Sequence, residues 1–370
     1  MRFRKGDILF GKLRPYFRKV IMAPFDGICS TDIWVVRPKP GIDARFLFYL
    51  MASQDFVDAA NRGSEGTRMP RAKWEFVTRF MCRIPPHAEQ QAIACILGAL
   101  DDKIELNRRM NQVLEAMARA IFKSWFIDFD PVRAKAAGRQ PAGLAPHIAE
   151  LFPDSFEESQ IGEVPKGWCI YPLPALIDIN PPRHIPRGVI APYLDMAGMP
   201  TQGHAPDFWI RREVGSGMKF INGDTLLARI TPCLENGKTA YVDFLKDGEV
   251  GWGSTEYIVL RPREPIPTVF AYLLARNSDF RAFTIQRMTG SSGRQRVPST
   301  SLADYQIIAP AVDSLVLKVF GRIVTPLFER MRSAMEQSRT LVALRDSLLP
   351  KLIFGELRTP DAERIVGRCF

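Results

Sequence analysis

Two short segments of the sequence contain residue types that serve catalysis in other proteins. Asn180-Pro181-Pro182-Arg183 begins like the N-P-P-aromatic motif of methyltransferases that modify base amino groups. That chemistry needs an aromatic side chain to stack on the flipped base, but Arg183 stands in its place and no glycine-rich cofactor loop precedes it. Gly237-Lys238-Thr239 resembles the end of a P-loop, but Pro232 occupies the position of the first glycine. We therefore expect neither motif to function.

Histidine, cysteine and acidic residues show no catalytic spacing either. The 4 histidines form no H-E-x-x-H or H-x-E pattern, and the 6 cysteines include no C-x-x-C pair. Glu115 and Asp128 are expected to be a helix-surface charge and a helix-end charge. The sequence therefore predicts no catalytic residue, no metal site and no bound cofactor. The scattered cysteines fit a protein of the reducing cytoplasm.

Basic residues are the main chemical feature of the sequence. A formal net charge of +10 favours an anionic partner, such as nucleic acid or an anionic membrane surface. The alternative is an arginine-rich protein without such a partner. The sequence has no apolar stretch of about 18 residues and no signal-peptide pattern, so we expect no membrane helix.

The loop Gly290–Pro298 is the best candidate for contact with double-stranded DNA. It ends a stretch, residues 281–296, that contains several arginines and no acidic residue. Glycine lets the backbone approach phosphates, and arginine can form two hydrogen bonds to guanine or phosphate. A solvated basic loop is the alternative. The candidate residues in this loop and in similar basic segments are Arg287, Arg294, Arg296, Lys238, Arg229, Arg68, Arg71, Lys73, Lys12, Arg14 and Arg18.

The chain also repeats itself, in an order that never breaks. The matched segments are Gly6–Leu9 with Gly223–Leu226, Leu13–Pro15 with Ile230–Pro232, Ser30–Pro38 with Ser254–Pro262, Phe48–Leu50 with Tyr272–Leu274, Asp55–Phe56 with Asp279–Phe280, Gly63–Gly66 with Gly290–Gly293, Arg68–Pro70 with Arg296–Pro298, and Ile84–Pro86 with Ile308–Pro310. The offset drifts by only a few residues, so chance is a poor explanation. We expect a pseudo-two-fold internal repeat.

Each copy is expected to contain the same elements. A strand follows each Gly-Asp pair, and the aromatic and β-branched runs Ile33–Val36 and Tyr257–Leu260 predict strands that end at Arg-Pro. One amphipathic helix is expected near Phe46–Ala60 and its counterpart near Val269–Phe283. A Gly/Ser loop and a short strand then close each domain, which predicts an α+β fold.

A long helix is expected after each domain. The first begins after Pro85-Pro86 and runs to about Phe126, with Asn107 and Asn111 in its apolar stripe. Asparagine within such a stripe is typical of a coiled coil with a fixed register. Neither helix can hide its stripe alone, so we expect the two to pack together, the alternative being that each packs on its own domain. The stripe residues are Ile93, Leu97, Leu100, Ile104, Leu114, Ile121 and Trp125 in the first helix and Leu327, Met331, Leu341, Leu348 and Leu352 in the second.

The second long helix is expected from about Val312 to Phe354. Pro326 predicts a kink, or a restart with Thr325 as N-cap. A Pro- and Ala-rich linker with a helical piece near His147–Leu151 separates the halves. The expected parts are a partial first domain at 1–86, a helix at 87–127, the linker at 128–161, a second domain at 162–310, a helix at 311–357 and a tail at 358–370.

The two copies differ at their fronts. About 55 residues separate Trp168 from Gly223-Asp224, whereas five residues precede Gly6-Asp7. The missing part does not reappear after Leu357, which excludes circular permutation. We expect the first copy to lack its front, through a misassigned start, a truncated gene or the loss of half a domain.

Several segments resemble the specificity subunit of type I restriction-modification systems. Lys123–Val132 and Leu348–Leu357 resemble the ends of that family's two long helices. Gly162–Trp168, written G-E-V-P-K-G-W, resembles the beginning of its second target-recognition domain. The resemblance covers nearly the whole chain and involves several motifs in order.

The resemblance implies two β-rich target-recognition domains, the first incomplete, separated by two long antiparallel coiled-coil helices. Each domain would read one half of a split, asymmetric DNA site, and the stripe-bearing helices would dock two methylation subunits and, through them, restriction subunits. The chain itself would be non-catalytic, because S-adenosylmethionine, ATP and Mg²⁺ would belong to those partners. The alternative is a scaffold that binds methylation subunits but no longer reads one half-site. Residues of the second domain's own front that the resemblance adds as DNA contacts are Arg183, His184, Arg187, Gln202, Arg211 and Arg212.

Overall fold

The structure is a computed structural model that describes residues 1–65, 69–291 and 293–367. The chain divides into two compact units. Among the described residues, no helix combines the length and the apolar character needed to span a lipid bilayer.

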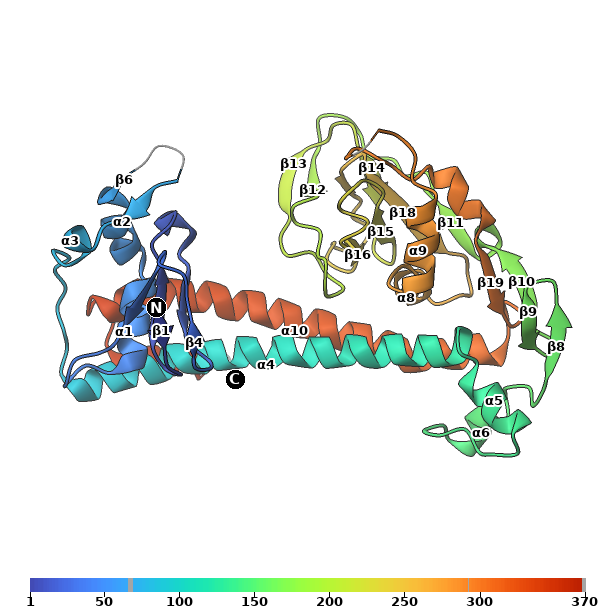
Figure 1. The fold of residues 1–370 in the computed structure, drawn as a ribbon, viewed down its shortest axis with the longest axis horizontal. Coiled ribbons are helices and arrows are strands. Elements are labelled where there is room, and N and C mark those ends of the chain that lie inside the picture. The colour runs from blue at the N-terminus through green and yellow to red at the C-terminus, as the bar shows by residue number, and fades with distance from the viewer. Residues whose placement is uncertain (66–68, 292, 368–370) are drawn as a thin grey trace. The chain divides into compact units, whose positions relative to one another are not determined.

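Unit 1 consists of Met1–Arg108 with Met335–Phe370, and unit 2 consists of Arg109–Ala334. Two long helices, α4 (His87–Phe126) and α10 (Leu315–Ile353), contribute to both units (Figure 1). Each unit therefore holds one copy of the repeat together with part of each long helix.

Unit 1 is built on a three-stranded antiparallel sheet. Its elements other than the long helices are β1 (Arg2–Phe3), β2 (Ile8–Gly11), η1 (Pro15–Phe17), β3 (Val20–Met22), β4 (Gly27–Ile28), β5 (Ile33–Val36), α1 (Ala44–Ala52), α2 (Gln54–Arg62), β6 (Ser64–Glu65), β7 (Arg71–Ala72), α3 (Trp74–Val77) and α11 (Thr359–Val366). The strand order is β3-β2-β5. The Phe10 ring in β2 lies 5.5 Å from the rings of Trp34 in β5 and Phe56 in α2, so these aromatics join the sheet to the helices.

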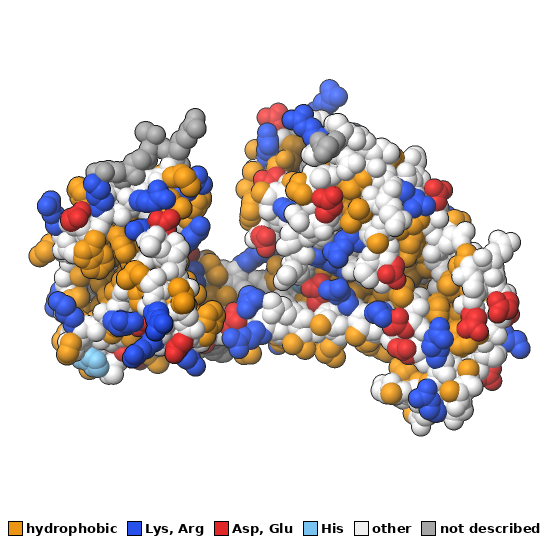
Figure 2. Space-filling model, in the orientation of Figure 1, with side chains coloured by type: hydrophobic (Ala, Val, Ile, Leu, Met, Phe, Trp, Pro, Cys, Tyr) orange, Lys and Arg blue, Asp and Glu red, His pale blue; other side chains and the backbone are white. Residues whose placement is uncertain are grey.

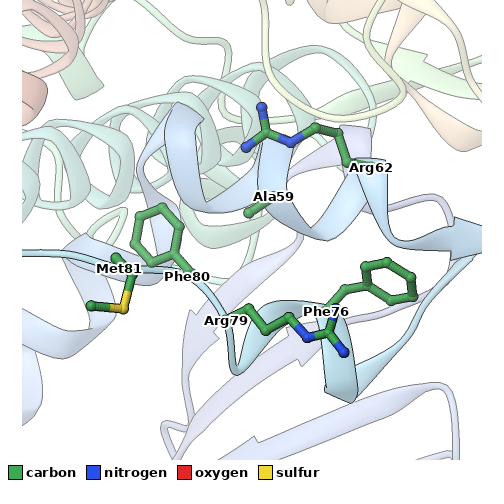
Figure 3. Close-up of a pocket in the computed structure, with 6 residues that line it drawn as sticks. All are labelled: Ala59, Arg62, Phe76, Arg79, Phe80 and Met81. Atoms are coloured by element: carbon green, nitrogen blue, oxygen red, sulfur yellow. The ribbon is translucent and has the colours of Figure 1, made fainter.

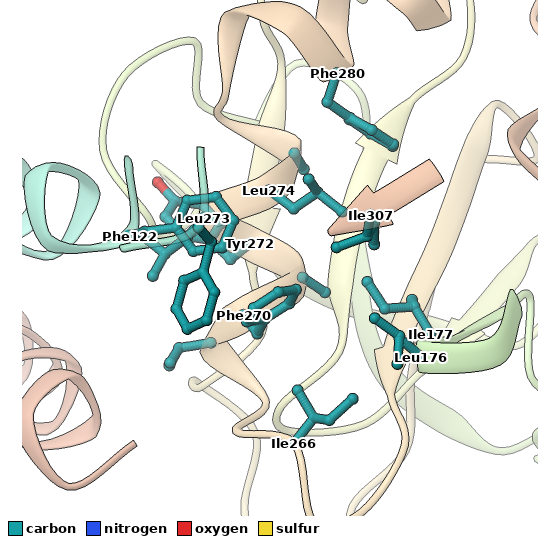
Figure 4. Close-up of a cluster of buried hydrophobic side chains, with 14 of the residues drawn as sticks. Phe122, Leu176, Ile177, Ile266, Phe270, Tyr272, Leu273, Leu274, Phe280 and Ile307 are labelled. Atoms are coloured by element: carbon teal, nitrogen blue, oxygen red, sulfur yellow. The ribbon is translucent and has the colours of Figure 1, made fainter. Parts of the chain in front are cut away.

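Unit 2 contains the larger copy. Its elements other than the long helices are α5 (Asp130–Ala136), α6 (Pro146–Ala149), β8 (Phe156–Ser159), β9 (Gly162–Pro165), β10 (Cys169–Pro172), α7 (Leu173–Leu176), β11 (Ile177–Ile179), β12 (Ile190–Leu194), β13 (Ile210–Glu213), β14 (Met218–Phe220), β15 (Thr225–Ala228), β16 (Thr239–Tyr241), β17 (Gly251–Gly253), β18 (Tyr257–Pro262), α8 (Val269–Ala275), α9 (Ser278–Gln286), η2 (Ser299–Asp304) and β19 (Gln306–Ala309). One sheet has the order β11-β18-β15-β16 and another the order β13-β12-β17-β14, while β10 pairs with β19 and β8 with β9. All seven residues of α8 are buried, because this helix packs on the first sheet and its Phe270 meets Phe122 of α4 (Figure 4).

The strands expected after the two Gly-Asp pairs are confirmed as β2 and β15, and β5 spans the expected residues Ile33–Val36. β18 runs two residues further than expected, through Arg261-Pro262. The closing strand is confirmed in unit 2 as β19. It is wrong for unit 1, where residues 81–86 form no strand.

Each expected amphipathic helix is in fact two helices, so that prediction was wrong. Ser53 is extended between α1 and α2, and its Oγ accepts a hydrogen bond from the Phe56 N–H. Asn277 caps α9 in the same way, accepting from the N–H groups of Asp279 and Phe280. A side chain that satisfies free N–H groups begins a new helix in the middle of the apolar pattern.

The repeated Gly-Asp and Arg-Pro pairs meet in space. Arg37 donates to Asp7 Oδ1 at 2.7 Å and to Oδ2 at 2.6 Å, and the Arg4 N–H also donates to this carboxylate. The hydrogen bond from Arg37 lowers the pKa of Asp7 below its usual value. In unit 2, Arg261 lies 3.3 Å from the fully buried Asp224. In both units this ion pair fastens the start of one strand to the end of its neighbour.

The two long helices pack against each other, as expected from their stripes. In each unit the chain order shows that they run antiparallel, because Asp101 contacts Arg345 while Asn107 contacts Gln337 in unit 1. The stripe residues in or against the apolar cluster of unit 1 are Ile93, Leu97, Leu100, Ile104, Leu341, Leu348 and Leu352. Those in or against the main cluster of unit 2 are Leu114, Ile121, Trp125, Leu327 and Met331.

The two asparagines lie in this seam as expected. Asn107 Nδ2 donates to Gln337 Oε1 at 2.9 Å, and Asn111 Nδ2 donates to the Met331 carbonyl oxygen at 3.2 Å. The restart expected at Pro326 is wrong, since α10 is continuous through it. Buried Val324 and Phe328 hold the turns on both sides of the proline, which offsets its missing N–H.

The segment expected to be a linker is ordered and packed. It contains α5 and α6, the latter at the expected helical piece. Phe129, Val132 and Phe152 are buried in the main cluster of unit 2. These apolar residues give the segment a core contact that its proline and glycine content does not indicate.

Replacing Leu100 by Ala is expected to lower the free energy of unfolding by about 2–5 kcal/mol, because it removes buried methyl groups from the seam of unit 1. Leu100 is 0% exposed, whereas Leu106 on the same helix is 57% exposed and provides the control. Urea unfolding followed by circular dichroism measures both variants. Equal losses for Leu100→Ala and Leu106→Ala would contradict the packing described.

Candidate nucleic-acid interface

The basic loops of the two units are fastened in the same way. Arg71 Nε donates to Asp32 Oδ1 at 2.9 Å in unit 1, and Arg296 Nε donates to Glu256 Oε1 at 2.8 Å in unit 2. Asp32 and Glu256 are matched positions of the repeat, each just before the β5 or β18 strand. These two arginines therefore set the position of their loops.

The structure corrects the repeat register at these loops. Leu13 forms a bridge with Arg71, and Ile230 forms the matching bridge with Arg296. Arg71, and not Arg68 as the sequence match implied, is the counterpart of Arg296. Arg68 lies outside the described residues. The sequence match went wrong because an Arg-x-Pro pattern is short enough to occur by chance three residues away.

Several predicted DNA-contacting residues already have partners in their own unit. The pairs are Arg183 with Asp224, Arg211 with Glu249, Arg229 with Glu256, Lys238 with the carbonyl oxygen of Met196, and Arg18 with the carbonyl oxygen of Ala52. Arg287 lies with its guanidinium 3.4 Å from the centroid of the Phe283 ring. These contacts restrict the side chains, and they hold Arg183 and Lys238 inside the unit rather than in solvent.

The remaining candidates differ in exposure. Lys12, Arg14 and Lys73 lie near the Leu13–Arg71 bridge and are half-buried. Arg187 and Arg294 are exposed, and neither forms an ion pair within the part of the chain that the structure describes. Figure 2 shows that Lys and Arg on the drawn face of each unit are interleaved with Asp and Glu instead of forming one stripe.

The two segments that resembled catalytic motifs have structural roles. The Asn180 side chain accepts a hydrogen bond from the Val259 N–H at 2.9 Å, and its own N–H donates to the Val259 carbonyl oxygen at 2.7 Å. Asn180 thus ends β11 on the edge of β18. Lys238, in the P-loop-like segment, donates to Met196. Among the described residues no group of three His, Cys, Asp or Glu side chains is arranged to hold a metal ion.

A buried polar network in unit 2 escaped the sequence reasoning. Glu115, expected at the helix surface, is buried, and Tyr272 donates its hydroxyl proton to Glu115 Oε1 at 2.6 Å. Burial raises the pKa of Tyr272 well above its usual value. Arg276 Nε in turn donates to the Tyr272 hydroxyl oxygen at 3.0 Å. The network therefore joins α4 to α8.

Arg276 also fixes two irregular segments of unit 2. Its guanidinium donates to the backbone carbonyl oxygens of Thr201, Gly203, Gly237 and Thr239. These segments lie beside Gln202 and Lys238, which the sequence proposed as DNA contacts. No sequence pattern could have found this role, because the acceptors are backbone atoms that every residue has.

Unit 1 has a shallow pocket on α2, α3 and the chain that follows. Its lining consists of Ala59, Arg62, Phe76, Arg79, Phe80 and Met81 (Figure 3). The Arg79 guanidinium lies 5.8 Å from the centroid of the Phe76 ring. The lining is apolar and cationic, and it contains no acidic side chain.

Comparisons with known proteins give a consistent result. A family model described as the type I restriction modification DNA specificity domain matches residues 1–116. The chain is 26% identical over 405 residues to the type I restriction enzyme HindI specificity subunit of Haemophilus influenzae, covering 96% of this chain and 87% of that protein. It is 26% identical over 374 residues to the MjaIX specificity subunit of Methanocaldococcus jannaschii, covering 97% and 79%. The crystal structure of a type I restriction-modification S subunit from M. genitalium has a similar fold, with a TM-score of 0.51 at 15% identity over 95% of this chain and 83% of that one.

Tyr272→Phe is expected to lower the free energy of unfolding of unit 2 by about 1–3 kcal/mol, because the buried Glu115 carboxylate loses its hydroxyl donor. Tyr305→Phe is the matched control, since the Tyr305 ring packs on Phe280 and Phe283 and keeps those contacts without its hydroxyl. Hydrogen exchange of α8 amides reports unit 2 directly. An unchanged exchange rate in Tyr272→Phe would show that the network does not stabilise the unit.

Proposed function

The chain belongs to the type I restriction-modification DNA specificity family, and from this premise we propose that it reads a split, asymmetric DNA site and docks the subunits that modify it. As a specificity subunit it serves DNA target recognition, and specificity subunits are non-catalytic. The observation that carries the proposal is the duplicated, carboxylate-fastened basic loop. Two similarly built loops suit two half-sites that differ in sequence.

Exposure ranks the proposed DNA contacts. Arg294 and Arg187 are free to reach phosphates or base edges, and Arg287 can reach out from its ring contact. Arg71 and Arg296 position their loops through their ion pairs. Phosphate contacts orient a protein on DNA, while contacts with base edges specify the sequence.

The outer face of α4 is our proposed docking surface for the methylation subunits. The stripe residues named from the sequence are buried or half-buried in the seam, so a partner would contact other faces of the helices. Val113 and Met117, one turn apart, are 58% and 48% exposed, while Ala118 and Phe122 face the core. A helix that is apolar on two faces usually has two partners.

The remaining parts of the proposal concern chemistry outside this chain. Two methylation subunits and, through them, restriction subunits would supply S-adenosylmethionine, ATP and Mg²⁺. The cytoplasmic location stays a prediction. The alternative function is a scaffold that binds methylation subunits without reading one half-site. Unit 1 favours this alternative, because its sheet is one strand narrower than the matching sheet of unit 2.

Arg294→Ala is expected to weaken binding of target DNA and to reduce the salt dependence of the affinity by the share of one phosphate contact, if Arg294 contacts the backbone. A loss of about 1–3 kcal/mol confined to one base pair of the target would instead identify a base contact. Lys166→Ala, at an exposed lysine of unit 2, is the control. Fluorescence anisotropy over a range of salt concentrations measures both. Unchanged affinity in Arg294→Ala would remove this residue from the interface.

Val113→Asp combined with Met117→Asp is expected to abolish co-purification with the methylation subunits, because the charges would be buried in the interface. Binding of DNA by the purified chain should persist, since neither side chain lies in the seam. Gln112→Glu, on the adjacent face of α4, is the control. Intact assembly of the double variant would place the docking surface elsewhere.

A further inference from the structure

The sheets of the two units differ at one edge. In unit 2, β18 lies between β15 and β11, with Asp178 of β11 opposite Arg261. In unit 1, the matching strand β5 pairs with β2 alone and ends the sheet. β5 also stops at Val36, whereas β18 continues through Pro262, where β11 pairs with it.

The free edge of β5 can be assigned to particular atoms. The Lys12 N–H donates to the Asp32 carbonyl oxygen, so alternation places the N–H and C=O of Val35 on the side away from β2. In unit 2 the matching residue, Val259, forms two hydrogen bonds with Asn180 on that side. Such unpaired edge groups are a template for another strand.

A second edge is open in the same unit. Phe80 packs edge-to-face on Phe56 as Tyr305 does on Phe280, which aligns the residues that follow. In unit 2 these residues form β19, paired with β10. In unit 1 they are Met81–Ile84 and form no strand. Ile84 is 44% exposed, whereas its counterpart Ala309 is 1% exposed.

The apolar positions beneath these edges are only partly covered in unit 1. Ile258, Leu260 and Tyr272 are fully buried in unit 2. Their counterparts Trp34, Val36 and Phe48 are half-buried. The cover in unit 2 includes Leu173, Leu176 and Ile177 of the segment β10–α7–β11, two of which appear in Figure 4 among the core side chains.

We propose that unit 1 binds a strand–helix–strand segment with the chemistry of Cys169–Asn180, donated by a separate polypeptide. Its first strand would pair with Met81–Ile84, its second would pair with β5 beyond Val35, and its leucine and isoleucine side chains would cover Trp34 and Val36. This binding is β-strand addition with pockets for alternate side chains. It does not depend on the proposed function, since it concerns the fold of unit 1.

A second copy of this chain is a poorer donor. Its own segment is already hydrogen-bonded, with β10 on β19 and β11 on β18. Donation would leave those strands unpaired and expose Leu173 and Ile177, which are fully buried. A separate polypeptide carries no such penalty.

The test uses the full chain and a synthetic peptide with the sequence of residues 168–181, W-C-I-Y-P-L-P-A-L-I-D-I-N-P. We expect saturable binding by fluorescence anisotropy and slower hydrogen exchange at Val35, Arg37 and Ile84. A peptide with Asp178→Pro lacks an N–H on the pairing side and should bind about tenfold more weakly. Absence of saturable binding at about 1 mM peptide would overturn the proposal.

Chain variants locate the site. Val35→Pro removes the free edge N–H, a position at which an edge strand tolerates proline, and should weaken peptide binding about tenfold. Met22→Pro, on the opposite edge strand β3, is the control, because alternation places its N–H away from β2 as well. Circular dichroism checks that both variants fold, and the Asp178→Pro peptide serves if they do not. Equal binding by wild type and Val35→Pro, or a dimer of the chain alone that Val35→Pro dissociates, would overturn the proposal.

Discussion

The antiparallel apolar seam between α4 and α10 is the interaction on which both units depend. Helices of this length bury their stripes only against a partner, and in each unit the buried faces of α4 and α10 supply that partner. The β-rich copy then packs on the same seam, as Phe46 does in unit 1 and Phe270 in unit 2. Loss of the seam would therefore expose the inner face of each recognition copy as well as the helices.

Much of the fold could be predicted from the sequence, because its pattern is local. Apolar spacing located both long helices, and Gly-Asp located β2 and β15. The division of the amphipathic helices at Ser53 and Asn277 was missed, because a capping side chain competes with helix continuation inside an unbroken apolar pattern.

The candidate interface was predicted less well than the fold. Basic segments were found from composition, but their ion pairs join residues about 40 positions apart, as Arg296 and Glu256 are. Glu115 was assigned to the surface because a lone acidic residue on a helix usually lies there. Only the tertiary structure shows the Tyr272 hydroxyl that makes its burial possible. Sequence periodicity indicates which face of a helix is buried, but not which polar group it meets.

Arg276 has a consequence for how such a protein can change its specificity. It grips the segments near Thr201 and Thr239 through carbonyl oxygens alone. Side chains in those segments can therefore be exchanged without altering what Arg276 binds. The framework is indifferent to the letters displayed on it, so new recognition surfaces can be sampled by mutation while the chain keeps its fold.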